Sequence, residues 1–107
     1  MIPKFIDLMK QNKQPTINGD GTFSRDFTYI DNIVHGNLLA SESSDAVGQV
    51  MNLATGDCVS LLELVDAVNN VLGTSIEPIH EDARVGDILH SQANIDKAEN
   101  LLDFAPV

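Results

Sequence analysis

The chain has 107 residues, of which 43% are hydrophobic and 21% are charged, so it is long enough for one globular domain of ordinary composition. Sixteen acidic against six basic side chains give a formal charge of -10, which disfavours attraction to nucleic acid or to an anionic membrane. The single cysteine, Cys58, cannot form an internal disulfide, and no apolar run approaches the roughly 18 residues of a membrane span. We therefore expect a cytoplasmic protein with one domain over 1–107 and with no nucleic-acid or membrane partner.

Apolar spacing and turn residues predict the elements at the start of the chain. A helix is expected over 2–12, where apolar residues recur at helical spacing and Pro3 stands in the first turn. An extended run over 14–18 leads into the glycine-rich turn 19–21, which predicts a connection between two strands. The second of these strands is expected over 23–29.

The middle of the chain predicts a helix followed by a strand. Asp31 or Asn32 is the expected cap of this helix, and the polar loop 41–45 is its expected end. The compact apolar run 50–54 predicts a strand.

The second half of the chain contains the best-marked helix. Ser60 and Glu63 form a capping box ahead of the apolar spacing of 61–72, and Gly73 predicts where the helix stops. The remaining expected elements are an edge strand over 76–80, an irregular segment over 81–91 and a helix over 94–102. Together these elements predict a mixed α/β fold of about four helices with short strands.

The two arginines of this acidic chain, Arg25 and Arg84, are its clearest candidates for ligand binding. A guanidinium group offers planar, bidentate hydrogen bonds to phosphate or carboxylate, so two of them could clamp a diphosphate. The alternative is that each arginine forms an ordinary ion pair. The acids available for such pairs nearby in the sequence are Asp20, Asp26, Glu81 and Asp82.

Six short segments spread over the chain form one ordered pattern. They are Ile2-Pro3-Lys4-Phe5, Ile17-Asn18-Gly19-Asp20-Gly21, Arg25-Asp26-Phe27-x-Tyr29-Ile30-x-Asn32, Asn52-Leu53-Ala54-x-Gly56, Ser60-Leu61-x-Glu63-Leu64 and Arg84-x-Gly86-Asp87-x-x-His90-Ser91. In this order they resemble the C-terminal, substrate-binding portion of the NAD-dependent epimerase/dehydratase family, the extended short-chain dehydrogenases. UDP-N-acetylglucosamine and UDP-glucose 4-epimerases are the members that the pattern resembles most. Met51 departs from it, because the family usually has tyrosine there.

The resemblance implies a small substrate-binding domain without the Rossmann core. It implies that Arg25 and Arg84 hold the diphosphate of a UDP-sugar and that Asp87 binds ribose hydroxyls. It also implies that Thr16 and Asn18 lie on the strand that approaches the base.

The same resemblance implies that Phe27 lies near the substrate. From the residues alone, Phe27 fits a core aromatic better, and Thr16 and Asn18 fit plain strand residues equally well.

The parts that perform catalysis in the family are absent from these 107 residues. Tyr29 is the only tyrosine and is followed four residues later by Ile33, so no Tyr-x-x-x-Lys pair exists, and no Gly-x-x-Gly-x-x-Gly turn is present to bind NAD. The resemblance therefore implies a portion with no catalytic residue and no cofactor contact of its own. NAD and the catalytic pair would belong to a dinucleotide-binding half, and apolar surface left uncovered would favour a homo-oligomer or domain exchange.

Other functions fit parts of the pattern. The chain could be a stand-alone, non-catalytic binding or interaction module, or the matching portion of a nucleotide-sugar dehydratase. A metal site could be drawn from His80 and His90 with Asp82 and Asp87, but the ligand spacing is irregular and we expect no metal.

Overall fold

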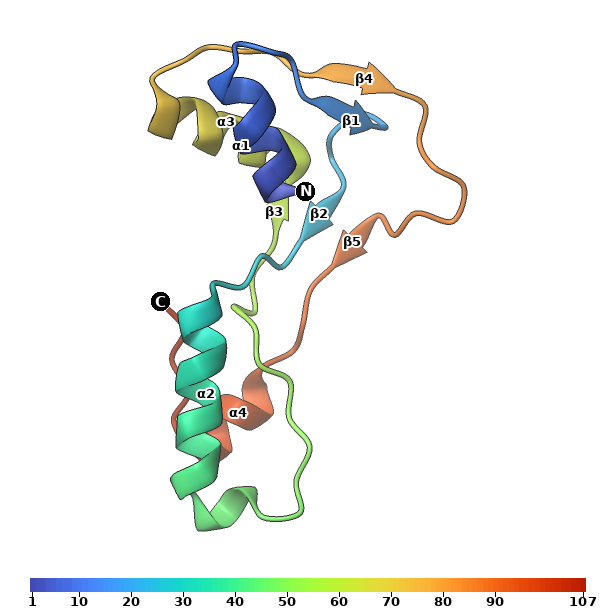
Figure 1. The fold of residues 1–107 in the computed structure, drawn as a ribbon. Helices are drawn as coiled ribbons and strands as arrows, with labels where there is room; N and C mark the ends of the chain where they lie inside the picture. Colours follow the sequence, from blue (N-terminus) through green and yellow to red (C-terminus); the bar gives the residue numbers. More distant parts are fainter. The chain divides into compact units, whose positions relative to one another are not determined.

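The computed structural model describes all of residues 1–107 and contains four α-helices, five short strands and one 3-10 turn (Figure 1). In chain order these are α1 (Ile2–Lys10), β1 (Thr16–Asn18), β2 (Ser24–Arg25), α2 (Ile30–Glu42), η1 (Ser44–Ala46), β3 (Val59–Ser60), α3 (Leu61–Leu72), β4 (Ile79–Glu81), β5 (His90–Ser91) and α4 (Asp96–Leu102). This confirms the mixed α/β class with four helices and short strands. None of the helices has the length and apolarity that crossing a membrane requires.

The contacts divide the chain into two compact units, each built from two stretches of sequence. The first unit contains 1–25 and 59–90, and the second contains 26–58 and 91–107. Each unit has buried side chains of its own.

The first unit packs α1 against α3 beside the pair β1–β4, which is visible in Figure 1. Its buried side chains include Phe5 and Met9 of α1 and Leu64 of α3. The strands β1 and β4 are parallel, with Ile17 opposite His80, and β2 pairs antiparallel with β3.

The capping box at the start of α3 is confirmed. The Ser60 N–H donates to Glu63 Oε2 at 2.7 Å, and the Glu63 N–H donates to Ser60 Oγ at 3.2 Å. Gly73 ends the helix in the left-handed conformation with φ of 69°. The local sequence determines where this helix begins and ends, because the capping box needs the side chains of Ser60 and Glu63 and the left-handed end favours glycine.

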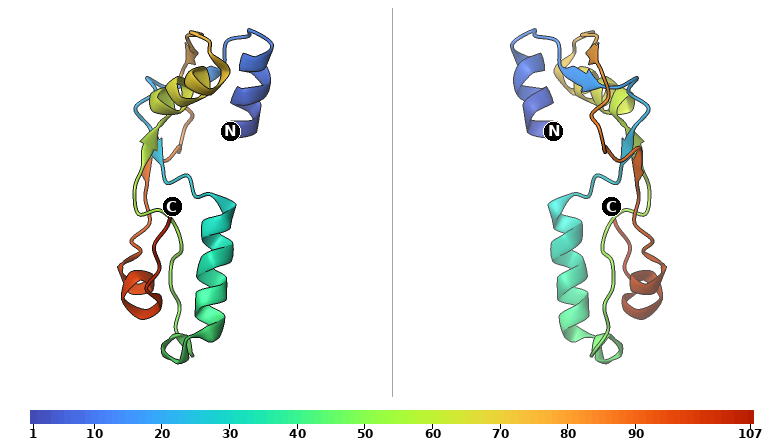
Figure 2. Two further views of the ribbon diagram at one scale, coloured as in Figure 1. Left: turned by 90° about the vertical axis from the view of Figure 1, so that its left-hand side faces the viewer. Right: turned by 90° about the vertical axis from the view of Figure 1, so that its right-hand side faces the viewer.

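The second unit contains α2 and α4 around a small apolar core. Its buried members are Ala54, Ile95, Ala98, Leu102 and Phe104. The segment 47–58 runs alongside α2 (Figure 2), and a Cβ on Gly36 would lie only 2.6 Å from a methyl carbon of Leu53. Glycine at this position therefore lets the segment pack closely against the helix.

The expected cap of α2 is wrong. The helix begins at Ile30 after Tyr29, which makes no side-chain cap hydrogen bond, so Asp31 and Asn32 lie inside its first turn. Asn32 instead binds the backbone of Val107, donating to its carbonyl at 3.4 Å and accepting from its N–H at 2.9 Å. The side chain is only 1% exposed, so a long-range backbone contact has replaced the local cap.

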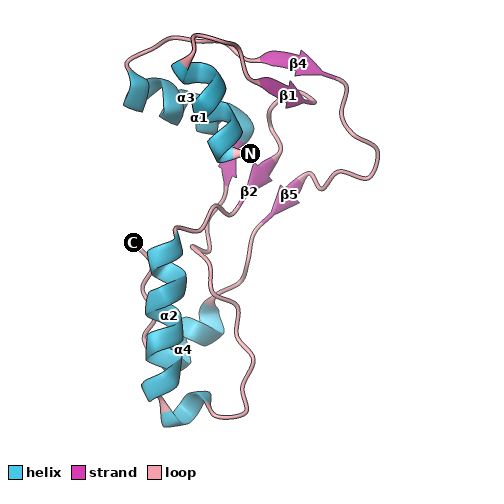
Figure 3. Cartoon of the chain, viewed as in Figure 1, coloured by secondary structure: helices cyan, strands magenta, loops and turns pink.

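Three expected strands differ from the observed ones. The run 50–54 forms no strand, and Figure 3 draws it as loop, because no segment of the chain lies in register to complete its hydrogen bonds. The strand expected over 23–29 is confined to β2, and the one expected over 76–80 is displaced to β4, beyond Pro78. The pair β1–β2 is not a hairpin, since the two strands belong to different sheets.

Two observed strands and one helix start also differ from the expectation. β3 and β5 are two-residue strands on either side of β2, in places where the sequence carries no strand pattern. Such short elements exist through pairing with β2 and have no local signal of their own. The last helix begins at Asp96, two residues later than expected.

Candidate functional site

The first unit contains a pocket of about 260 Å³ that gathers most of the predicted site residues. Its walls come from α1, β1, β2, the start of α3 and the loop between β4 and β5. The lining residues are Met1, Lys4, Phe5, Thr16, Ile17, Asn18, Phe23, Arg25, Leu61, Arg84 and Asp87.

The charge of this lining is opposite to that of the chain. Three of the six basic side chains, Lys4, Arg25 and Arg84, line the pocket, but only one of the sixteen acids, Asp87, does so. In a chain with a formal charge of -10, such a concentration of cations makes this pocket the most favourable place on the chain for an anionic ligand.

Arg25 is held by two contacts at the edge of β2. Its Nη1 donates to the Ser24 carbonyl at 2.8 Å, and its Nη2 donates to Asp87 Oδ1 at 3.3 Å. The ion-pair alternative is therefore partly right for Arg25, but the partner is Asp87 and none of the acids suggested by sequence proximity. The Arg25 and Asp87 side chains are 25% and 30% exposed, so both remain accessible from the pocket.

A tight turn brings Arg84 and Asp87 to the same pocket. The Asp87 N–H donates to the Arg84 carbonyl at 3.2 Å. Gly86 adopts φ of 79°, a backbone conformation that would be strained for a residue with a side chain. Asp87 Oδ1 also accepts from the Ile88 N–H at 3.1 Å. Arg84 makes no ion pair, so the ion-pair alternative is wrong for this residue.

The predicted residues of β1 lie on the same pocket, but Phe27 does not. Thr16, Ile17 and Asn18 all line it, with Thr16 and Asn18 half-buried and Ile17 between them buried. Phe27 is half-buried in the second unit, and the pocket instead contains Phe23.

Sequence reasoning missed Phe23 and Lys4. Phe23 lies two residues after the glycine-rich turn, and strand alternation would have placed it on the same face as Arg25, two residues later. The only signal for Lys4 was the scarcity of cations in the chain.

The two histidines suggested for a metal site serve other contacts. His80 Nδ1 lies 2.8 Å from the Gly19 carbonyl oxygen, and His90 Nδ1 lies 2.7 Å from Oγ of the buried Ser24. No group of three or more potential metal-ligating residues occurs in the chain.

Asp26, next to Arg25 in sequence, binds a turn of the second unit. Its carboxylate accepts from the Thr55 hydroxyl at 2.6 Å, the Thr55 N–H at 3.1 Å and the Gly56 N–H at 3.0 Å. Burial alone would raise the pKa of Asp26, but these hydrogen bonds outweigh it and hold the pKa below its usual value. Asp26 therefore acts as an ionised anchor for the turn.

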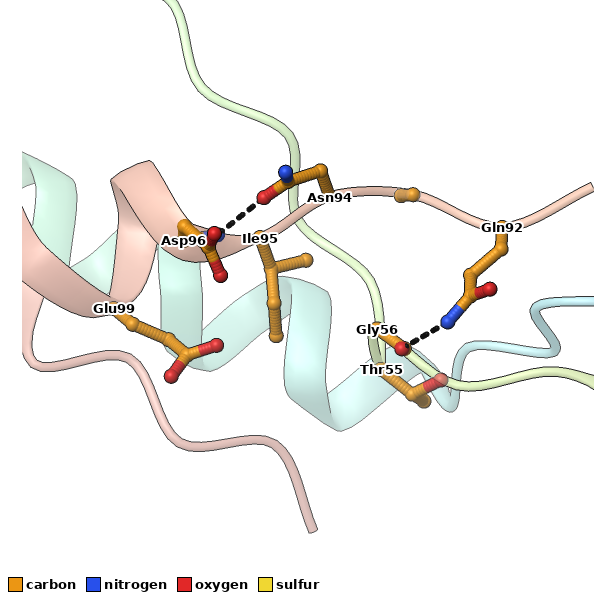
Figure 4. Close-up of a pocket in the computed structure, with 8 residues that line it drawn as sticks. Thr55, Gly56, Gln92, Asn94, Ile95, Asp96 and Glu99 are labelled. Carbon is orange, nitrogen blue, oxygen red and sulfur yellow. Dashed lines mark hydrogen bonds between the residues drawn. The ribbon is translucent and has the colours of Figure 1, made fainter.

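A second pocket, of about 400 Å³, lies beside this turn (Figure 4). Its lining residues are Thr55, Gly56, Gln92, Ala93, Asn94, Ile95, Asp96 and Glu99. Gln92 Nε2 donates to the Gly56 carbonyl, and the Asp96 N–H donates to Asn94 Oδ1 at 2.9 Å. Because the lining has two carboxylates and no cation, this pocket does not suit a phosphate.

Comparisons with known proteins show which family the chain resembles. The model of the family described as "NAD dependent epimerase/dehydratase family" matches residues 1–54. A UDP-glucuronate 4-epimerase of Thermodesulfobacterium geofontis is 29% identical over 104 residues, which are 96% of this chain and 32% of that protein.

Solved structures of 4-epimerases resemble the chain over its whole length. The UDP-N-acetylglucosamine 4-epimerase of Methanobrevibacter ruminantium, in complex with UDP-N-acetylmuramic acid, is 36% identical with a TM-score of 0.90 over 100% of this chain and 34% of its own. The UDP-glucuronic acid 4-epimerase of Bacillus cereus, with UDP-glucuronic acid and NAD, is 32% identical with a TM-score of 0.89 over 99% and 34%. The chain thus spans about a third of the length of the relatives it matches.

Proposed function

Since the chain belongs to the NAD dependent epimerase/dehydratase family, we propose that it is the UDP-sugar binding portion of a 4-epimerase. The observation that supports this most is the convergence of Arg25, Arg84 and Asp87, from segments far apart in the sequence, on one pocket beside β1. The similar solved structures are named as UDP-sugar 4-epimerases and contain UDP-sugars, which supports the same ligand class here.

In this proposal the two arginines bind the diphosphate. Each guanidinium donates charge-assisted hydrogen bonds to phosphate oxygens, while β1 at Thr16 and Asn18 lies beside the base. A phosphate oxygen replaces Asp87 as the partner of Arg25 Nη2, and the freed carboxylate then accepts hydrogen bonds from ribose hydroxyls.

The role of these residues is to orient the substrate. A diphosphate held from two sides fixes where the attached sugar lies, which lowers the entropic part of the barrier for chemistry performed by other groups. The Tyr-x-x-x-Lys pair and the Gly-x-x-Gly-x-x-Gly turn are absent from the 107 residues, so we assign no proton transfer and no NAD contact to this chain. NAD, where it binds in the family, supplies the hydride acceptor.

We further propose that a dinucleotide-binding half or a second copy of the chain covers apolar surface of the second unit. On α2, Ile30, Val34 and Leu38 recur every four residues, and each is more than half exposed. Light scattering of the purified chain tests for a homo-oligomer or domain-exchanged dimer, and Val34→Lys should reduce association if this face is involved.

Calorimetric titration tests the ligand. UDP-N-acetylglucosamine, UDP-glucose and UDP are titrated into the chain and into an Arg25→Ala, Arg84→Ala double variant, with Lys13→Ala as a control outside the pocket. Losing charge-assisted bonds of about 1.5–3 kcal/mol each should weaken binding at least tenfold in the double variant. Equal affinity of the double variant and the control would overturn the assignment of the pocket. The absence of binding to a folded wild-type chain would show that these residues do not bind UDP-sugars by themselves.

A further inference from the structure

The pocket contains a cation, Lys4, to which neither the family resemblance nor the arginine pair gives a role. Lys4 lies in the first half of α1, between the exposed Pro3 and the buried Phe5, and lines the pocket. Its ammonium group makes no ion pair with any of the sixteen acids of the chain and no hydrogen bond. A charge left unpaired by an acidic chain is available to a ligand.

The charges of the lining then match the ligand proposed above. The lining has three cations and one anion, and Arg25 already forms an ion pair with Asp87. The cations without a protein partner are therefore Arg84 and Lys4. The diphosphate bridge of a nucleotide sugar carries two negative charges, so these two cations can neutralise it before the Arg25–Asp87 ion pair opens.

We propose that Lys4 is a third binding residue for the diphosphate of the nucleotide sugar and, together with Arg84, makes the first contact with it. This inference rests on the proposed function. Lys4 and Arg84 draw the anion into the pocket against the field of a negatively charged chain. Arg25 then moves from Asp87 to a phosphate oxygen, which leaves Asp87 to the ribose.

The position of Lys4 suits this role. It stands on a helix whose next residue, Phe5, is 5% exposed and fixes the helix against the unit, while the lysine itself remains exposed. Its flexible stem lets the ammonium follow the diphosphate as the arginine contact forms. An exposed side chain of this kind contributes little to folding, so its replacement tests binding without disturbing the fold.

The test compares Lys4→Met with Lys10→Met by calorimetric titration of UDP-glucose. Both variants lose one lysine charge from α1, but Lys10 does not line the pocket. We expect Lys4→Met to weaken binding roughly threefold to tenfold at low salt, as suits an exposed charge, and Lys10→Met to stay within about twofold. Lys4→Arg, which keeps the charge, should bind within about twofold of the wild-type chain.

Ionic strength separates a charge contact from a structural effect. Between about 20 mM and about 200 mM NaCl the screening length falls from roughly 20 Å to roughly 7 Å, so the wild-type advantage over Lys4→Met should shrink. Equal affinities of Lys4→Met and Lys10→Met, with binding still lost in the Arg25→Ala, Arg84→Ala variant, would overturn the role of Lys4 and leave the proposed function intact. A weakening by Lys4→Met that is independent of salt, or that Lys4→Arg fails to restore, would also overturn it. Failure of a folded wild-type chain to bind would overturn the role of Lys4 in this chain and would show that these residues do not bind UDP-sugars by themselves.

Discussion

Replacing Asp26 with Asn should destabilise the second unit by about 2–3 kcal/mol at neutral pH. The carboxylate accepts hydrogen bonds from the Thr55 hydroxyl, the Thr55 N–H and the Gly56 N–H, and charge-assisted bonds of this kind contribute about 1.5–3 kcal/mol each. Asparagine retains one acceptor oxygen for Thr55. However, it turns an NH₂ group toward the Gly56 N–H, which leaves two donors facing each other.

The destabilisation should depend on pH in a definite direction. The folded-state pKa of Asp26 is lowered, so the unfolded chain takes up the proton first on acidification. The stabilisation is complete above the unfolded pKa of about 3.9 and is lost as the pH falls through the folded pKa. The difference between the wild-type chain and Asp26→Asn should therefore be largest near neutral pH and shrink in strong acid.

Tyr29 provides a local probe for this measurement. It is the only tyrosine, the chain has no tryptophan, and it belongs to the second unit, so its fluorescence follows urea unfolding of that unit. Glu42→Gln serves as the control because Glu42 is an exposed residue of the same unit whose side chain makes no hydrogen bond, and it should change stability by less than about 0.5 kcal/mol. If Asp26→Asn and Glu42→Gln unfold at the same urea concentration near neutral pH, the anchoring role of Asp26 is refuted.

Two further predictions concern backbone positions. Gly21→Ala should be more destabilising than Gly48→Ala, because both glycines have positive φ but a Cβ on Gly21 would lie 2.5 Å from Leu62 Cγ, whereas nothing lies within 4 Å of one on Gly48. Gly48→Ala should therefore cost about 1 kcal/mol and Gly21→Ala at least about twice that in thermal unfolding, and equal effects would show that Leu62 moves aside. The amides of Met51, Asn52 and Leu53 have no hydrogen-bond partner, so they should exchange with deuterium within about tenfold of the unprotected rate, while those of Val65 and Val68 in α3 are protected. Protection of Asn52 comparable with that of Val68 would mean that this segment pairs with another strand.

The elements predicted correctly are those with local causes. The start of α1 follows from Pro3 and the apolar spacing behind it, and α3 follows from the hydrogen bonds of Ser60 and Glu63 and from Gly73. Each of these signals lies within a few residues of the element that it determines, so one sequence is enough to find it.

The elements predicted wrongly depend on distant residues. Asn32 has a side chain suited to a helix cap, but this side chain forms its hydrogen bonds with the backbone of Val107 instead. The run 50–54 has the composition of a strand, yet a strand exists only when a second one pairs with it. Met51 and Leu53 nevertheless pack toward the core while Val50 and Asn52 are exposed, so the period of two that predicts a strand is preserved without the hydrogen bonds.

The candidate site was predictable in its residue types but not in its pairings. The scarcity of arginine in an acidic chain pointed to Arg25 and Arg84, and the family pattern added Asp87, Thr16 and Asn18. Phe27 does not line the pocket because β2 ends at Arg25, so the alternation of side chains along the strand does not extend to Phe27.

The Arg25–Asp87 contact is compatible with both interpretations of the arginines, an ordinary ion pair and a ligand clamp. An ion pair and a ligand clamp are alternatives only if the acid that pairs with the arginine lies outside the ligand site. Here both side chains line one pocket, and the 3.3 Å contact between them is longer than the 2.7–2.9 Å typical of a strong charge-assisted bond. A phosphate oxygen can replace Asp87 at little cost, because the pair is partly exposed and such pairs contribute only about 0–1 kcal/mol. If the pocket binds a UDP-sugar as proposed, the ion pair keeps both groups placed in the absence of the ligand, and its weakness lets them separate when the ligand binds.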